Sequence, residues 1–172
     1  MERFKYNRPR PNEDFTPKHS TLVSRIGNWL PVTNKFSCVA VMMERGGYCG
    51  GGESPDVFGV DAKGISYLIE CKISRSDFLS DQKKPWRLLP ESSLGKYRYY
   101  AAPAGLLDPD EMPAGWGLLE VTKTQIWTVK DSEVFNQNES ALRKEIGFLS
   151  RAIRDIRCGV IIVSNTQEDS DA

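Results

Sequence analysis

Residues 54–86 read SPDVFGVDAKGISYLIECKISRSDFLSDQKKPW, and the rest of the chain is organised around this stretch. It contains two β-rich runs, at 57–60 and 65–73, which are separated by the polar turn Asp61-Ala62-Lys63-Gly64. Turn residues between two β-rich segments are typical of an antiparallel β-hairpin. We therefore predict that the two runs pair with each other as a hairpin within a β-sheet.

Three charged side chains converge in this predicted hairpin. Side chains alternate between the two faces of a strand, so Glu70 and Lys72 share one face while the residues between and beside them point into a core. Asp56 stands at the start of the neighbouring strand, where it approaches Glu70 across the hairpin. Charge on a half-buried sheet costs free energy unless it is paired or binds a metal ion. The arrangement therefore indicates a functional site.

The pattern Asp…Glu-x-Lys suits metal-dependent hydrolysis of phosphodiester bonds. Carboxylate oxygens hold Mg²⁺, which takes only one or two carboxylates from a protein and keeps several waters. The ion polarises a phosphoryl oxygen and lowers the pKa of a bound water. A lysine beside one ligand orients that water and offsets charge that develops on the phosphate. The spacing fits equally well a surface hairpin with a cross-strand ion pair, worth roughly 0.2–1 kcal/mol.

Pro55-Asp56, followed by Glu70-Cys71-Lys72, resembles the signature of the PD-(D/E)xK nuclease superfamily, which has the restriction-endonuclease-like fold. The chain also resembles one subgroup, the MmcB-like bacterial DNA-repair proteins, over residues 20 to 122. Further segments that carry this second resemblance are 74–78, 81–83, 97–101 and 115–119. The short signature has low specificity, and the helix and strands that follow it strengthen the resemblance.

The resemblance implies an α/β fold with a restriction-endonuclease-like core, in which helices flank a mixed central β-sheet in the order αβββαβ. It implies that Asp56 and Glu70 bind Mg²⁺ (or Mn²⁺) together with the backbone carbonyl of Cys71, and that Lys72 orients the attacking water. A polar residue on the following helix helps to position the phosphate or the water in such proteins, and Gln82 is our candidate. The alternative for Gln82 is a solvated helix face.

The predicted first helix departs from the family pattern. Many relatives carry an acidic residue there that faces the active site, whereas residues 17–31 contain none. Glu44, at the end of the predicted first strand (38–44), is our candidate for the missing ligand, and the alternative is an exposed glutamate at a strand end. His19 is the only histidine. It lies near the helix start, where a polar residue commonly faces solvent, so we do not assign it a catalytic role.

The 172 residues suffice for one domain with a proper core, and we assign it to residues 16–164. Lysine and arginine together number 23, as do aspartate and glutamate, so nucleic acid binding requires a local basic patch. Residues 71–100 are rich in basic side chains and supply one. The residues that we expect to contact nucleic acid are Arg75, Lys83, Lys84 and Arg87. Residues 1–15 read as a flexible basic arm and 165–172 as a disordered acidic tail.

Other sequence patterns limit the location and the cofactors of the protein. The four cysteines show no CxxC spacing and no neighbouring histidine, which argues against a zinc site. No apolar stretch is long enough to span a membrane, and the N-terminus lacks a signal-peptide core. We therefore expect a cytoplasmic protein without membrane contacts.

The remaining elements follow from apolar periodicity. A helix with Thr16 as its N-cap and Pro17 at its first position is expected to end at Pro31. A short helix begins after Ser74, and a long one covers 139–157. The apolar residues of the long helix should cover the sheet or pair with a second subunit, as in a homodimer: Leu142, Ile146, Leu149, Ile153 and Ile156. The strands predicted beyond the hairpin are 97–102, 116–121, 125–129 and 160–163.

These patterns together predict a Mg²⁺-dependent deoxyribonuclease, an endonuclease rather than an exonuclease, that acts in DNA repair or processing. The alternative is a non-catalytic nucleic-acid-binding module with the same fold. A second alternative is a partner-binding protein that assembles through its long C-terminal helix.

Overall fold

The computed structural model of the protein describes residues 15–43 and 53–157. The predicted basic arm (up to residue 14), Glu44, the strand at 160–163 and the acidic tail lie outside these residues. The α-helices are α1 (His19–Trp29), α2 (Arg75–Asp81) and α3 (Glu139–Arg157). The strands are β1 (Cys38–Met43), β2 (Val57–Asp61), β3 (Ser66–Cys71), β4 (Tyr97–Pro103), β5 (Gly117–Val121) and β6 (Ile126–Lys130). Three short 3₁₀ turns are η1 (Pro85–Leu88), η2 (Pro90–Ser92) and η3 (Pro109–Glu111).

Over the described residues the fold is α/β, with one mixed sheet whose six strands lie in sequence order. Strands β1, β2 and β3 form an antiparallel meander. Strands β3, β4 and β5 are parallel, and β6 pairs antiparallel with β5. The predicted hairpin is confirmed, because Val57 pairs with Ile69 and Val60 with Ser66. The predicted order of helix, three-strand meander, helix and strand is also what the chain shows.

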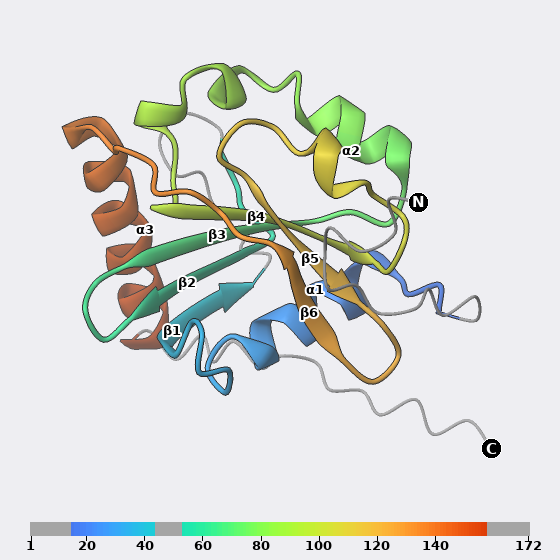
Figure 1. The fold of residues 1–172 in the computed structure, drawn as a ribbon. Helices are drawn as coiled ribbons and strands as arrows, with labels where there is room; N and C mark the ends of the chain where they lie inside the picture. The colour runs from blue at the N-terminus through green and yellow to red at the C-terminus, as the bar shows by residue number, and fades with distance from the viewer. Residues whose placement is uncertain (1–14, 44–52, 158–172) are drawn as a thin grey trace.

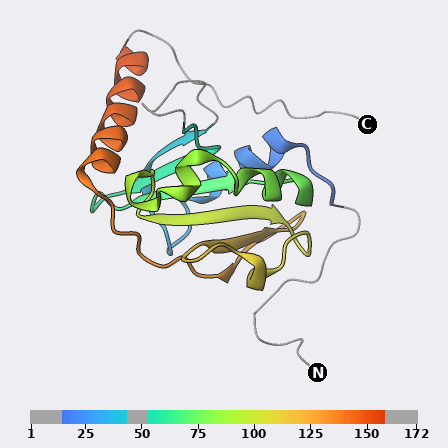
Figure 2. The same cartoon turned by 90° about the horizontal axis from the view of Figure 1, so that it is seen from above.

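Helices cover both faces of the sheet. In Figure 1 α1 lies below the sheet and α2 above it, while α3 stands at one side. Figure 2 looks down on α2 and the neighbouring 3₁₀ turns, which lie over the sheet. No helix among the described residues is long and apolar enough to cross a membrane.

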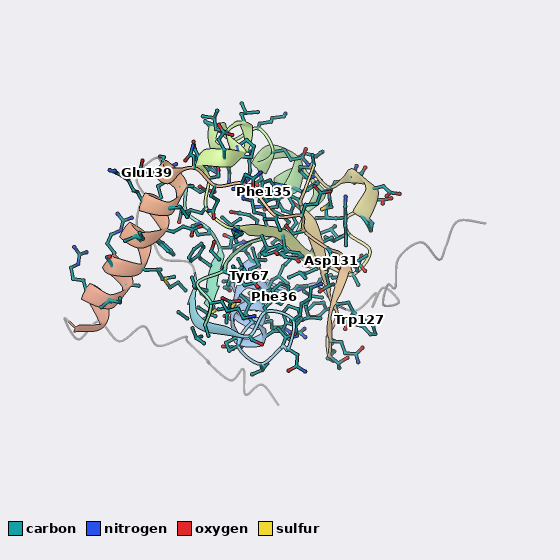
Figure 3. The ribbon with its side chains drawn as sticks, turned by 60° about the vertical axis from the view of Figure 1, so that its left-hand side comes forward. Phe36, Tyr67, Trp127, Asp131, Phe135 and Glu139 are labelled. Carbon is teal, nitrogen blue, oxygen red and sulfur yellow. The ribbon has the colours of Figure 1, made fainter. Side chains whose placement is uncertain are left out.

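The sheet separates two cores, as alternation along the strands requires. Towards α1, the buried residues of β3 are Tyr67, Ile69 and Cys71. Phe36 packs edge-on against Tyr67 in this core, with 5.1 Å between ring centroids (Figure 3). Towards α2, the core contains Phe58 and Leu68 of the hairpin, together with Phe78, Tyr100 and Phe148. Glu70 and Lys72 therefore face the α2 side.

The start of α1 differs from the prediction. Lys18, not Thr16, is the N-cap, and it makes no side-chain capping hydrogen bond. The backbone explains the shift, because Leu22 N donates to Lys18 O and makes Lys18 the first acceptor of the helix. The start of α2 agrees with the prediction, since Ser74 Oγ accepts a hydrogen bond from Asp77 N at 3.2 Å.

The bounds of α3 agree with the prediction, but the face that it buries agrees only in part. The side chains that it packs inward are those of Ala141, Glu145, Phe148 and Ala152. Leu142, Ile146 and Ile153 of the predicted stripe are 47%, 64% and 59% exposed. The carboxylate of Glu145 explains the rotation, because its Oε1 accepts hydrogen bonds from Ser66 Oγ and Gly95 N and so turns this side of α3 to the core. Leu149 of the stripe does pack against the core, so only part of the predicted stripe covers the sheet.

We predict that Gly95→Ala destabilises the protein more than Gly64→Ala. Both glycines have positive φ, which costs an L-residue about 1–2 kcal/mol. A Cβ at Gly95 would also lie 2.5 Å from Leu68 Cβ, whereas one at Gly64 would meet nothing within 4 Å. Overpacking of this kind costs about 1–3 kcal/mol more. Urea unfolding of both variants checks the difference, and equal losses would contradict it.

Candidate active site

One end of the β2–β3 hairpin gathers the residues that the sequence singled out. Because the strands are antiparallel, the start of β2 lies beside the end of β3. Asp56 directly precedes β2, and its Oδ2 accepts a hydrogen bond from Cys71 N at 2.8 Å. This bond fixes Asp56 beside the Glu70-Cys71-Lys72 segment.

Glu70 and Lys72 form a buried ion pair on the α2 face of the sheet. Lys72 Nζ donates to Glu70 Oε2 at 3.2 Å, and the two side chains are only 4% and 3% exposed. Lys72 N also donates to Ala101 O at 2.8 Å, which holds the backbone of Lys72 against β4. The alternation predicted from sequence thus places both side chains together, but inside the protein rather than on an open surface.

Arg87 joins three carboxylates in the same region. Its Nη2 lies 2.8 Å from Glu70 Oε1, its Nε 2.9 Å from Asp81 Oδ2, and its Nη1 3.3 Å from Glu53 Oε1. The guanidinium also lies 4.8 Å from the centroid of the Trp116 ring. We name the group of Glu53, Glu70, Lys72, Asp81, Lys84 and Arg87 the charge cluster.

Asp81 is the most enclosed member of the charge cluster. It is fully buried, and its Oδ2 also accepts a hydrogen bond from Tyr100 OH at 2.8 Å. Lys84 Nζ lies 2.6 Å and Lys72 Nζ 3.5 Å from its Oδ1. Burial by itself raises the pKa of Asp81, but Arg87, Lys72 and Lys84 together hold that pKa well below its ordinary value.

The pKa values of the Glu70–Lys72 pair are both raised. Burial raises the pKa of Glu70, although Arg87 and Lys72 act against it, and the nearby Asp56 carboxylate adds to the rise. Burial lowers the pKa of Lys72, but the Glu70 and Asp81 carboxylates outweigh burial and raise it. Lys72 is therefore protonated at neutral pH and acts as a hydrogen-bond donor and positive charge, not as a base.

The edge of the site nearest to solvent consists of Asp56, His19 and the Cys71 carbonyl. His19 Nε2 lies 3.2 Å from Cys71 O and 3.4 Å from Asp56 Oδ2. The side chains of His19 and Asp56 are 36% and 19% exposed, far more than those of Glu70 and Lys72. The first helix thus does contribute a side chain to the site, although that side chain is an imidazole rather than a carboxylate.

The donor atoms at this edge fit a hard divalent cation. Asp56 supplies a carboxylate and Cys71 a carbonyl beside it, and Mg²⁺ needs only one or two carboxylates from the protein. Both oxygens of Glu70 contact cations, so Glu70 binds a metal ion only if one of these contacts is given up. Within residues 15–43 and 53–157, no three His, Cys, Asp or Glu side chains gather as a metal centre.

The other predicted site residues take different positions. Gln82 is the C-cap of α2, and its neighbour Asp81 rather than Gln82 itself belongs to the charge cluster. Arg75 is exposed and pairs with Glu111, and Lys83 is exposed beside the partly exposed Lys84.

Arg87 was expected to contact nucleic acid from the protein surface, but the structure places it in the interior. Its side chain is only 6% exposed, and it pairs with three carboxylates inside the protein. The reason is that η1, which follows the break at Pro85, turns Arg87 towards the sheet.

Sequence reasoning did not assign Glu53 and Asp81 to the site. A signal existed for Asp81, which stands three residues after the core residue Phe78 and so lies on the same side of α2. No local pattern indicated Glu53. Its partner Arg87 is distant in sequence and lies in a 3₁₀ turn that shows no periodic pattern of apolar residues.

Two surface cavities lie away from the charge cluster. One of about 590 Å³ is lined by residues of α1 and of the β5–β6 region, including Arg25, Trp29 and Trp127. The other, of about 650 Å³, lies at the opposite end of the hairpin and includes Tyr67 and Asp131 in its lining (Figure 3). Neither contains a residue of the charge cluster or of the Asp56 edge.

Comparisons with known proteins bear on the fold. No protein-family model matches the chain, and no curated protein shows significant sequence similarity to it. Among solved structures, the chain is similar to a protein of unknown function from Silicibacter pomeroyi, with a TM-score of 0.58 and 20% identity. The match covers 83% of this chain and 94% of that one. This similarity supports the α/β fold.

We predict that Arg87→Met lowers the free energy of unfolding by about 3–5 kcal/mol, because it leaves buried carboxylates without their partner. Arg143→Met is the matched control, since Arg143 pairs with Glu139 on the exposed side of α3. An exposed helix pair of this kind contributes about 0.3–0.5 kcal/mol. Urea unfolding checks both, and a loss at Arg87 as small as that at Arg143 would contradict the prediction.

We further predict that the stabilisation due to Asp81 depends on pH. The folded state lowers the pKa of Asp81, so its contribution is complete above the unfolded value of about 3.9 and is lost as pH falls below that value. Asp81→Asn should be less stable than wild type at pH 7. The difference should narrow by up to about 1.4 kcal/mol per pH unit below about pH 4. Urea unfolding from pH 7 to pH 2.5 measures it, and a constant difference would refute the prediction.

Proposed function

We propose that the protein is a metal-dependent nuclease that hydrolyses DNA phosphodiester bonds, and that it works as an endonuclease in DNA repair or processing. One observation carries the proposal. The hairpin brings Asp56, Glu70 and Lys72 to the same end of the sheet, with Asp56 bonded to Cys71 N and Lys72 to Glu70. These are the residues of the PD-(D/E)xK signature that the sequence resembles.

The proposal includes a restriction-endonuclease-like core. Its support is the order α1, β1, β2, β3, α2, β4, with an antiparallel meander followed by a parallel strand. Helix α2 and the turns η1 and η2 connect β3 to β4 over the face on which Glu70 and Lys72 lie. This connection supplies the residues that surround the proposed catalytic pair.

Each residue of the proposed site has a separate task. Asp56 and the Cys71 carbonyl would hold Mg²⁺ (or Mn²⁺), and Glu70 would join them as the second carboxylate by giving up its contact with Lys72 or Arg87. When bound, the ion polarises the phosphate and makes a water more acidic. The protonated Lys72 orients that water and offsets charge on the phosphate. Gln82 is proposed to help position the phosphate or the water, and the exposed Arg75 and Lys83 and the partly exposed Lys84 are proposed to contact the nucleic acid.

A second candidate function is a nucleic-acid-binding module that does not cleave. The observation that favours it is the pairing of both Glu70 oxygens, one with Lys72 and one with Arg87. A carboxylate that is neutralised in this way has no need of a metal ion. DNA binding by such a module would still weaken steeply with salt.

We predict that wild-type protein cleaves DNA with Mg²⁺ or Mn²⁺, and that Asp56→Asn, Glu70→Gln and Lys72→Met each lower the rate at least about 100-fold. The assay uses labelled duplex, single-stranded and branched DNA. Lys63→Met is the matched control for Lys72→Met, because Lys63 is exposed in the turn at the other end of the hairpin. This control should cleave at the wild-type rate.

The outcomes separate the two candidate functions. Equal cleavage by wild type and Lys72→Met would indicate a contaminating nuclease and refute the proposal. DNA binding without cleavage in any variant would favour the binding module. Circular dichroism of each variant establishes that a lost activity does not reflect a lost fold.

A further inference from the structure

His19 makes a long-range contact that its position at the start of α1 does not require. Its Nε2 lies 3.2 Å from Cys71 O and 3.4 Å from Asp56 Oδ2. These partners lie far from His19 in the sequence, at the end of the hairpin. The N-cap of α1 is Lys18, so the ring of His19 does not cap its own helix.

The two oxygens that face the imidazole are those that the proposed function assigns to the metal ion. A ring nitrogen, a carboxylate and a backbone carbonyl therefore meet at one point. Each is a common metal ligand, and imidazole in its neutral form binds through a nitrogen such as Nε2. In this structure Nε2 lies 3.2 and 3.4 Å from these two oxygens, close enough for one cation to contact all three atoms.

We propose that His19 is a direct ligand of the metal ion, together with Asp56 and the Cys71 carbonyl. This inference rests on the proposed metal-dependent function. A ligand set that includes an imidazole nitrogen favours a first-row transition ion over Mg²⁺, because imidazole binds such ions well whereas Mg²⁺ prefers oxygen alone. The site therefore binds Mn²⁺ in preference to Mg²⁺, and His19 takes the place of the acidic residue that residues 17–31 lack.

The chain makes this inference easy to test, because His19 is its only histidine. Full-length protein without a histidine tag is labelled with ¹⁵N-histidine and loaded with Mn²⁺ at a fixed pH of 7.5. Pulsed electron paramagnetic resonance should then detect one directly coordinated ¹⁵N nucleus. Labelled Asp56→Asn should lose the bound Mn²⁺ and with it this signal.

Isothermal titration of the two metal ions gives the second readout. His19→Ala should weaken Mn²⁺ binding at least about tenfold and Mg²⁺ binding by less than about threefold. His19→Gln keeps a side chain of similar size that donates a hydrogen bond, and it should lose the same affinity. Lys63→Met should bind both ions as wild type does.

Three results would overturn the inference in distinguishable ways. Mn²⁺ binding without a coordinated nitrogen, or unchanged in His19→Ala, would exclude His19 as a ligand while the proposed nuclease function stands. If His19→Ala and His19→Gln lost as much affinity for Mg²⁺ as for Mn²⁺, His19 would not be the cause of a preference for Mn²⁺. Failure of wild type to bind either ion would refute both the inference and the proposed function.

Discussion

The burial of one guanidinium determines how this end of the molecule is built. Arg87 lies in a low-dielectric interior, where an unpaired charge costs much free energy, so it requires carboxylate partners. These partners come from three separate segments of the chain. Glu53 precedes β2, Glu70 is the last residue but one of β3, and Asp81 ends α2. A rearrangement of any one of these segments would leave a buried charge unpaired. The cluster therefore favours one arrangement of sheet, helix and 3₁₀ turn over others.

This arrangement divides the candidate site into a fixed interior and a more accessible edge. Glu70 and Lys72 are held in place by buried ion pairs with other residues of the chain. Asp56 and His19 are partly exposed and lie at the end of the hairpin. Such a division would suit the proposed reaction on a nucleic acid, because charge is preorganised inside while the proposed metal ligands remain within reach of solvent.

The parts of the fold that could be predicted are those encoded locally. Turn residues 61–64 between two β-rich runs fixed the hairpin, and Ser74 marked the start of α2 correctly. The face of α3 was predicted only in part, because the buried Glu145 is polar and apolar periodicity gave it no weight. The partners of Arg87 could not be predicted for a related reason. Ion pairs between distant segments follow from the packed structure and leave no periodic pattern in the sequence.

Strand β3 pairs antiparallel with β2 but parallel with β4, and this difference bears on the order of folding. The hairpin closes over a four-residue turn, whereas the β3–β4 pairing must wait for a loop that includes α2, η1 and η2. Pairings between residues that are distant in sequence form more slowly, because closing the intervening loop costs conformational entropy before the contacts can form. We therefore expect Asp56, Glu70 and Lys72 to come together early in folding. Arg87 can reach Glu70 only when the crossover docks, so we expect the charge cluster to be completed later.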